Sequence, residues 1–263
     1  MLVEELHLWK DFQDFFHLYL PQLDYAAQKT GPDSEAAIQA VVELDEVVGQ
    51  LVTGFEQAYE SRELTWIAVS EYVITPVDHV SYPNRILREA GLLEVTVTDA
   101  GEQLDLQKSA AWALVDHQFS HVFVRDADPQ VCQRVRSCLE NAAGIAEVLV
   151  GDERAKYAMD HERSGEVILV SDADSWQAYY WWLDDALAPD YARTVDIHRK
   201  PGYDPVELFW DPVRNGVPLD ASCVKGSHGA PVLTAEQVGV ALSSRQDVLG
   251  SGALRDIDLA QLV

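Results

Sequence analysis

A carboxylate and an amide four residues apart near the start of the chain could approach one cation. Asp24 and Gln28 follow a short apolar run and a turn marked by Pro21. Residues four apart lie on the same side of a helical turn. A Gln amide oxygen is a poorer zinc ligand than a His nitrogen, so Gln28 would either make the site weak or favour a metal that prefers oxygen. The alternative is that Asp24 is a turn residue and Gln28 a surface position of a helix.

A histidine close to two glycines near the other end of the chain is the stronger candidate. In Gly226-Ser-His228-Gly229 the backbone can fold tightly around a ligand. Neutral imidazole is a common metal ligand. Both this segment and the one with Asp24 follow apolar runs that predict strands, and open α/β sheets bind ligands beyond their strand ends. The alternative for His228 is a hydrogen-bonded loop histidine.

Together the two segments resemble the second half of the metal site in the alkaline phosphatase superfamily, in its nucleotide pyrophosphatase/phosphodiesterase branch. That family has Pro-Asp, a His four residues later, and Gly-Pro three further on; Asp24, Gly31 and Pro32 match, whereas Gln28 does not. The last metal-binding His of the family stands in a Gly-x-His-Gly turn like that of His228. The resemblance implies a phosphoric ester hydrolase that uses divalent metal ions, with zinc first and manganese as the second option.

A third segment stands where the family has Ser-Asp-His-Gly at the end of a central strand. Here it reads Ser70-Glu71-Tyr72-Val73. The resemblance implies that Glu71 still offers an oxygen to metal. Tyr72 is an uncommon ligand and Val73 replaces a permissive glycine, so we expect this second site to be degraded. The alternative is a solvated glutamate at the edge of the sheet.

The resemblance does not cover the nucleophile. Members of the superfamily carry, upstream of the Asp24-type segment, a metal-binding Asp and a Thr or Ser that attacks phosphorus. Residues 2–16 contain no Ser or Thr. We therefore expect a chain truncated at its N-terminus relative to the family, with unknown catalytic residues and absent or impaired activity. The alternative is a non-catalytic module that keeps a metal- or phosphate-binding pocket or a protein-binding surface. Truncation would also expose sheet edges that are normally covered, which predicts a homodimer or poor solubility.

A loop rich in Pro, Gly and Asp, residues 192–219, concentrates cations in an acidic chain. Arg199 and Lys200 could contact the non-bridging oxygens of a phosphate ester, with Tyr203 close by as a further substrate contact. The alternative is a lid loop held by surface ion pairs.

Two other clusters favour structural interpretations. The polar residues between Asp116 and His121 have a spacing that does not converge on one ion, least of all in an extended segment. We expect them to line the cleft or to form hydrogen bonds in the sheet. The aromatic run Trp176–Trp182 is expected in the core, and a stacking platform for a flat ligand is the minority interpretation.

Length and charge bound the remaining choices. A chain of 263 residues, 48% hydrophobic, is long enough for one large domain, and we expect residues 1–263 to form a single one. Its net charge of −25 would repel a nucleic-acid polymer. The small phosphate ester expected as the partner is implied by the resemblance, and an acidic chain would need metal ions to offset the repulsion of such an ester. The chain has no apolar run of about eighteen residues and no leader, so we expect no membrane association and a cytoplasmic location.

The elements that must position these residues alternate between helices and strands. This order predicts an α/β fold, namely a mainly parallel sheet flanked by helices, with an antiparallel patch over residues 94–124. The resemblance implies that this sheet is a partial alkaline phosphatase-like core. We expect helices over residues 2–16, 34–59, 84–93 and 128–141, a short strand over 16–20, a buried strand over 64–70 and a further strand over 166–171.

Overall fold

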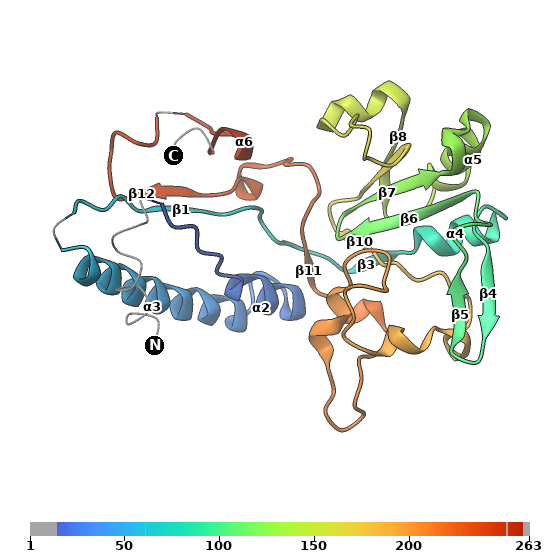
Figure 1. Ribbon diagram of the computed structural model, residues 1–263, viewed down its shortest axis with the longest axis horizontal. Coiled ribbons are helices and arrows are strands. Elements are labelled where there is room, and N and C mark those ends of the chain that lie inside the picture. The colour runs from blue at the N-terminus through green and yellow to red at the C-terminus, as the bar shows by residue number, and fades with distance from the viewer. Residues whose placement is uncertain (1–14, 61, 251, 260–263) are drawn as a thin grey trace. The chain divides into compact units, whose positions relative to one another are not determined.

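The computed structural model describes residues 15–60, 62–250 and 252–259 (Figure 1). The described residues form two compact units: unit 1 comprises those within the ranges 1–26, 33–73 and 232–263, and unit 2 comprises residues 27–32 and 74–231. The expected helix over residues 2–16 falls mainly outside the described ranges, and a single domain over residues 1–263 stays a prediction. Within the described ranges, no helix is long and apolar enough to cross a membrane.

Unit 1 is built on the long helix α3 (Glu35–Ala58). Ser34 caps it, because the Ser34 Oγ accepts a hydrogen bond of 3.1 Å from the Ala37 N–H. Apolar residues at helical spacing then bury one face of the helix, where Phe55 packs edge-to-face on Trp66 with 5.3 Å between ring centroids. The predicted amphipathic helix over residues 34–59 is therefore confirmed.

The strand of unit 1 differs from its expected environment. β1 (Ile67–Val69) pairs antiparallel with β12 (Ala241–Ser243) in a sheet of two strands. Val69 is 49% exposed, so the expectation of a buried strand here is wrong. In the described part of the chain β1 has one neighbouring strand, whereas a strand buried on both faces needs elements packed above and below it. Residues 16–20, expected as a strand, have no regular secondary structure.

Unit 2 contains a four-stranded sheet in the order β6-β7-β9-β8. All three pairings are antiparallel, and β6 and β7 can be followed side by side in Figure 1. Its core includes Val122, Val167 and Leu169 from the sheet and Leu139 from the helix that follows β7. The strands are β6 (Ala111–Asp116), β7 (Phe119–Val124), β8 (Ile145–Val150) and β9 (Val167–Ser171).

The helices of unit 2 begin and end close to where the sequence predicts. They are α4 (Pro83–Glu89) and α5 (Pro129–Leu139), and Asp128 caps α5 by accepting a hydrogen bond of 2.8 Å from the Gln130 N–H.

The helix α2 (Gln22–Thr30) belongs in part to each unit, and α6 (Asp256–Leu259) is short. The aromatic run from Trp176 to Trp182 is buried in the core, as expected.

The α/β class and the antiparallel patch are confirmed, whereas the mainly parallel sheet is borne out only in part. In the described ranges, β3 with β10 is the one parallel pair of strands. A short turn imposes antiparallel pairing, and just two residues join β6 to β7. The remaining strands are β2 (Thr75–Pro76), β3 (His79–Ser81), β4 (Val95–Thr98), β5 (Gly101–Leu104), β10 (Ser175–Gln177) and β11 (Gly226–Ser227), with β4 antiparallel to β5 and β2 antiparallel to β11.

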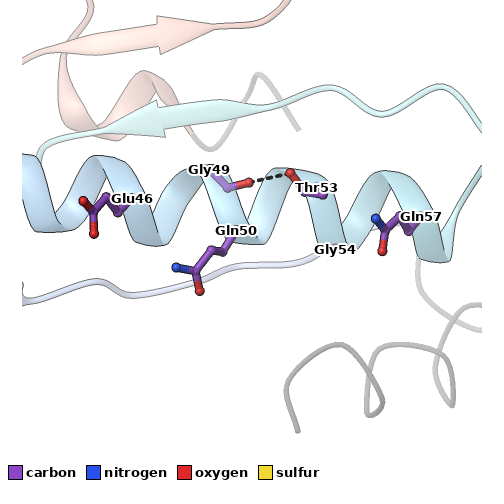
Figure 2. A pocket seen from close by; sticks show the side chains of 6 residues that line it. All are labelled: Glu46, Gly49, Gln50, Thr53, Gly54 and Gln57. Atoms are coloured by element: carbon purple, nitrogen blue, oxygen red, sulfur yellow. Dashed lines mark hydrogen bonds between the residues drawn. The ribbon is translucent and has the colours of Figure 1, made fainter.

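One exposed face of α3 contains a glycine that packing does not require. Figure 2 shows this shallow depression, which includes Gly49 and Thr53, and the Thr53 hydroxyl donates to the Gly49 carbonyl at 2.9 Å. A Cβ added at Gly49 would have no neighbouring atom within 4 Å. Glycine in a helix costs backbone entropy without a compensating contact here.

Gly49→Ala is therefore expected to stabilise the protein by roughly 0.5–1 kcal/mol, because alanine restricts the unfolded chain and fits the helix. The measurement is the midpoint of urea unfolding. Gln50→Ala, the adjacent exposed position of the same helix, is the matched control and should change stability by less than about 0.5 kcal/mol. A urea midpoint lower for Gly49→Ala than for wild type would contradict the conclusion that a methyl group fits at Gly49 without a clash.

Candidate functional site

The turn between β6 and β7 holds the loop that carries His228. His117 and Gln118 form this turn, and His117 adopts a left-handed conformation with φ of 55°. The Gln118 backbone N–H donates to the His228 carbonyl at 2.9 Å. The Gln118 side-chain oxygen accepts from the Ala230 N–H at 3.3 Å. These two hydrogen bonds fix the backbone on both sides of Gly229.

The imidazole of His228 stacks on that of His117. Their ring centroids are 3.9 Å apart and their planes are inclined by 30°. The Nδ1 of His117 lies 2.9 Å from the Asp116 Oδ1, which fixes the orientation of the His117 ring. Tyr203 lies on the same ring of His117 at 5.5 Å and is 62% exposed, whereas His228 is 9% exposed. His117 therefore connects an exposed phenol to a buried imidazole.

The environment of His228 keeps its imidazole neutral. Burial and, to a smaller extent, the nearby His117 lower its pKa, the carboxylate of Asp116 acts in the opposite direction, and the pKa falls in all from 6.5 to about 3. A neutral imidazole has a free nitrogen lone pair, which is the form that coordinates metal.

Gln28 is buried in the same unit as His228. It is 2% exposed, so the alternative of a surface helix position is wrong. The reason is that the last turn of α2 packs on β11: the Gln28 carbonyl accepts from the Lys225 N–H at 2.8 Å, and a Cβ at Gly226 would lie 2.4 Å from the Ala27 carbonyl oxygen. Beside His228, the buried Ser227 hydroxyl has no hydrogen-bond partner among the described residues.

Asp24 and Tyr72 meet in unit 1. Asp24 lies in the first turn of α2, and its Oδ1 accepts a hydrogen bond of 3.2 Å from the Tyr72 hydroxyl. Burial raises the pKa of Tyr72, and the charge of Asp24 raises it further, so the phenol stays a donor. The structure thus brings together two segments that the sequence singled out, with Tyr72 as a partner of the carboxylate. Glu71 is exposed.

The four residues expected as metal ligands divide equally between the units. Asp24 and Glu71 belong to unit 1, and Gln28 and His228 belong to unit 2. Across residues 15–60, 62–250 and 252–259, no three His, Cys, Asp or Glu side chains gather in a group that could hold a metal ion. The donor types fit a divalent cation, because neutral imidazole and carboxylate are its usual ligands, and the ligand roles stay predictions.

The expected phosphate contacts are engaged within the chain. The Lys200 ammonium lies 2.7 Å from Asp204, 2.6 Å from Glu207 and 2.9 Å from the Thr194 carbonyl, and its side chain is 1% exposed. These three partners match its three N–H donors. This geometry supports the alternative of a loop held by ion pairs, although the pair is buried rather than on the surface. A phosphate contact by Lys200 stays a prediction.

Arg199 makes contacts with residues of the same loop. Its Nε lies 2.6 Å from the Asp196 carboxylate, and its guanidinium lies 4.7 Å from the centroid of the Tyr191 ring. The hydrogen bond from Arg199 lowers the pKa of Asp196. The Arg199 side chain is 55% exposed, so it can reach solvent as well as its partners, and its role as a phosphate contact also stays a prediction.

The backbone of this loop docks directly on β6. Gly202 has φ of 118°, and a Cβ there would lie 2.0 Å from the Val115 carbonyl oxygen. Only glycine allows this approach. The Tyr203 N–H donates to the same Val115 carbonyl at 3.2 Å, which sets the Tyr203 ring against His117.

Sequence reasoning treated the segment from Asp116 to His121 as several donors on one strand and did not foresee the contact of His117 with His228. The available signal was the pair of apolar-alternating stretches separated by His117 and Gln118, which is the pattern of a hairpin. His-Gln is not a typical hairpin turn, since these turns favour Asn and Gly at positive φ.

The lowered pKa of His228 predicts a pH dependence of stability. Between pH 6.5 and about 3 the unfolded chain binds a proton that folded His228 does not bind. Stability is therefore lost as pH falls through this range, by up to about 1.4 kcal/mol per pH unit from this group. The measurement is the difference in unfolding free energy between wild type and His228→Asn as a function of pH.

The difference in unfolding free energy between wild type and His228→Asn should shrink as pH falls from 6.5. The reason is that wild type loses the stability contributed by the neutral His228 imidazole, whereas the variant has no imidazole to titrate at this position. His198→Asn, at an exposed position of unit 2, is the matched control. A difference that does not change with pH for His228→Asn would show that His228 titrates normally in the folded chain.

Comparison with known proteins assigns the chain to a family. The sequence model of the type I phosphodiesterase / nucleotide pyrophosphatase family matches residues 3–204. No curated protein sequence matches the chain. Similar solved structures include murine ectonucleotide pyrophosphatase / phosphodiesterase 5, which is 14% identical with a TM-score of 0.49, over 87% of this chain and 51% of that one. Phosphonoacetate hydrolase from Sinorhizobium meliloti 1021, in complex with phosphonoformate, is also 14% identical, with a TM-score of 0.47 over 89% of this chain and 48% of that one.

The chain thus spans about half the length of the solved structures that it matches. The family model, in contrast, covers most of the present chain, from residue 3 to residue 204 of 263. This protein belongs to the type I phosphodiesterase / nucleotide pyrophosphatase family.

Proposed function

We propose that this chain acts in a metal-dependent phosphoric ester hydrolase of the nucleotide pyrophosphatase/phosphodiesterase type, with His228 as a metal ligand. The observation that carries the proposal is the buried, neutral imidazole of His228, a residue directly after β11 whose backbone carbonyl accepts a hydrogen bond from Gln118. Family membership supports the reaction class, and proteins of this family generally depend on divalent metal ions.

The residues around His228 have separate roles in this proposal. Asp116 fixes the His117 ring, and His117 supports one face of His228, so the His228 nitrogen keeps one orientation. When bound, a divalent cation would polarise the phosphoryl oxygens and lower the pKa of the attacking hydroxyl. Zinc suits the imidazole, whereas the amide of Gln28 suits manganese better. Asp24, Gln28 and Glu71 are the further proposed ligands.

The proposed substrate is a small phosphate ester. The chain carries a net charge of −25, so an anionic ester needs a cation to offset repulsion. We propose that the exposed ring of Tyr203, beside His117, contacts the substrate, whereas Arg199 and Lys200 are already paired within their loop. The exclusion of nucleic-acid polymers and membranes, a homodimer and a cytoplasmic location stay predictions.

A non-catalytic module of the same fold is the second candidate. It is favoured by the finding that no three strong metal donors cluster among the described residues. Such a module would bind metal or phosphate without turnover.

The test is metal reconstitution with zinc or manganese, followed by metal analysis and hydrolysis of bis(p-nitrophenyl) phosphate. We expect wild type to bind metal and His228→Ala to bind it at least about tenfold more weakly, with turnover reduced in proportion. His198→Ala is the control, because its position is exposed in the same unit. Metal binding without turnover would select the module, and equal binding by His228→Ala would refute the ligand role of His228.

The role of His117 predicts a graded result. His117→Ala removes the ring that supports His228 and should weaken metal binding by about tenfold, whereas His117→Phe keeps a ring in the stack and should weaken it less. Asp116→Asn tests the hydrogen bond that fixes the His117 ring. The readouts are the metal dissociation constant and the NMR signals of the His228 imidazole in metal-free protein. If His117→Ala leaves both unchanged, His117 does not position His228.

A further inference from the structure

A second depression of unit 2 gathers cationic side chains in an otherwise acidic chain. The whole sequence has 44 Asp and Glu against 19 Lys and Arg. Three arginines nevertheless line this one pocket together with two aspartates, so its lining carries a small net positive charge. The lining residues are Tyr82, Arg85, Asp185, Arg193, Arg214, Pro218, Leu219 and Asp220, none of which belongs to the His228 cluster.

Arg85 is held rigidly at this pocket. Its guanidinium lies 4.4 Å from the centroid of the Tyr82 ring and 5.8 Å from that of Tyr180. Its Nε donates to the Trp182 carbonyl at 2.7 Å. The nearest carboxylate oxygen, on Asp185, is 3.7 Å from the Arg85 Nη2, which is too far for a hydrogen bond. The two terminal NH₂ groups of the Arg85 guanidinium are therefore oriented in advance and available to a ligand.

The two aspartates of the pocket are engaged by other donors. Asp185 accepts a hydrogen bond of 2.9 Å from the Trp182 indole N–H. Asp220 accepts from the Ser222 backbone N–H at 3.0 Å and from the Ser222 hydroxyl at 2.6 Å. Each aspartate thus has one carboxylate oxygen engaged by these donors, and Asp220 caps the short helix at Ala221–Cys223. Asp185 stays within ion-pair distance of Arg85, so a bound anion would compete with it for this arginine.

The other two arginines are less constrained than Arg85. Arg193 donates to the Asp185 carbonyl at a long 3.4 Å. Arg214 lies 3.5 Å from Asp211, and its side chain is 84% exposed. Both side chains can move toward a ligand without breaking a buried interaction. Planar guanidinium groups match the oxygens of a phosphate group, which they bind in pairs.

We propose that this pocket binds a phosphate group, with Arg85 as the fixed contact and Arg193 and Arg214 closing on it. The ligand is inorganic phosphate or a phosphate monoester, because a dianion is needed to draw three guanidinium groups together against their mutual repulsion. The inference does not depend on metal binding at His228 or on hydrolase activity.

The test is a titration of the full chain with inorganic phosphate and, separately, with methyl phosphate, followed by NMR of the arginine Nε–Hε groups. A chelator in the buffer removes metal, so that phosphate cannot bind through a cation. We expect saturable shifts of the Arg85 signal, and chloride at matched ionic strength should not reproduce them. Preference for one of the two ligands would identify the source of the phosphate group.

Three variants make the proposal falsifiable. Arg85→Gln should weaken phosphate binding by about tenfold or more, since a charge-assisted hydrogen bond is lost. Arg214→Gln, at a solvent-exposed position that leaves the core intact, should weaken it by a smaller factor. Arg134→Gln, on the exposed face of α5, is the control and should have no effect. Unchanged affinity in Arg214→Gln and Arg85→Gln, or equal shifts with chloride, would overturn the phosphate pocket.

Discussion

The buried side chain of Gln118 connects the parts on which the candidate site depends. It is 1% exposed, and its amide nitrogen donates to the Ala173 and Ser175 carbonyls at 3.2 and 3.1 Å. Its amide oxygen accepts from Ala230, beyond the histidine loop. One amide therefore links the β6–β7 turn, the start of the aromatic core segment and the loop of His228. Removing it would leave several buried polar groups unpaired at once, which is costly.

The hydrogen bonds of Gln118 explain why the pKa of His228 is lowered, although this histidine lies in a loop. Two hydrogen bonds with Gln118 hold the loop that carries His228. The His228 ring therefore stacks on His117 and is shielded from water, and this desolvation keeps the imidazole neutral. The same turn requires His117 to adopt a left-handed backbone conformation. Non-glycine residues in this region carry a modest conformational cost, which the surrounding hydrogen bonds must offset.

Local patterns predicted local structure well. The helices α3 and α5 follow from apolar spacing and from the caps Ser34 and Asp128, whose side chains accept the expected backbone hydrogen bonds. The two glycines near His228 were expected to let the backbone fold tightly: Gly229 adopts a positive φ of 100°, whereas Gly226 lies in β11, where a Cβ would lie 2.4 Å from the Ala27 carbonyl oxygen. Caps, apolar spacing and glycines each involve residues a few positions apart, so a single sequence is enough to recognise them.

Contacts between distant segments could not be predicted in the same way. The burial of Gln28 depends on Lys225, and the ion pairs of Lys200 depend on how its loop folds back on itself. The exposure of Val69 depends on which strands are present beside it. A continuous apolar stretch records a preference for burial, but the number of layers around it is set by the rest of the fold.

The most direct test of the central claim is NMR of the His228 imidazole nitrogens during a zinc titration of the full chain. We predict that the His228 signals, assigned by their loss in His228→Asn, move to a metal-bound position and saturate together with zinc uptake. Zinc uptake that leaves the His228 nitrogens unchanged would contradict it, because the metal would then bind elsewhere, and the absence of any zinc uptake would contradict it as well.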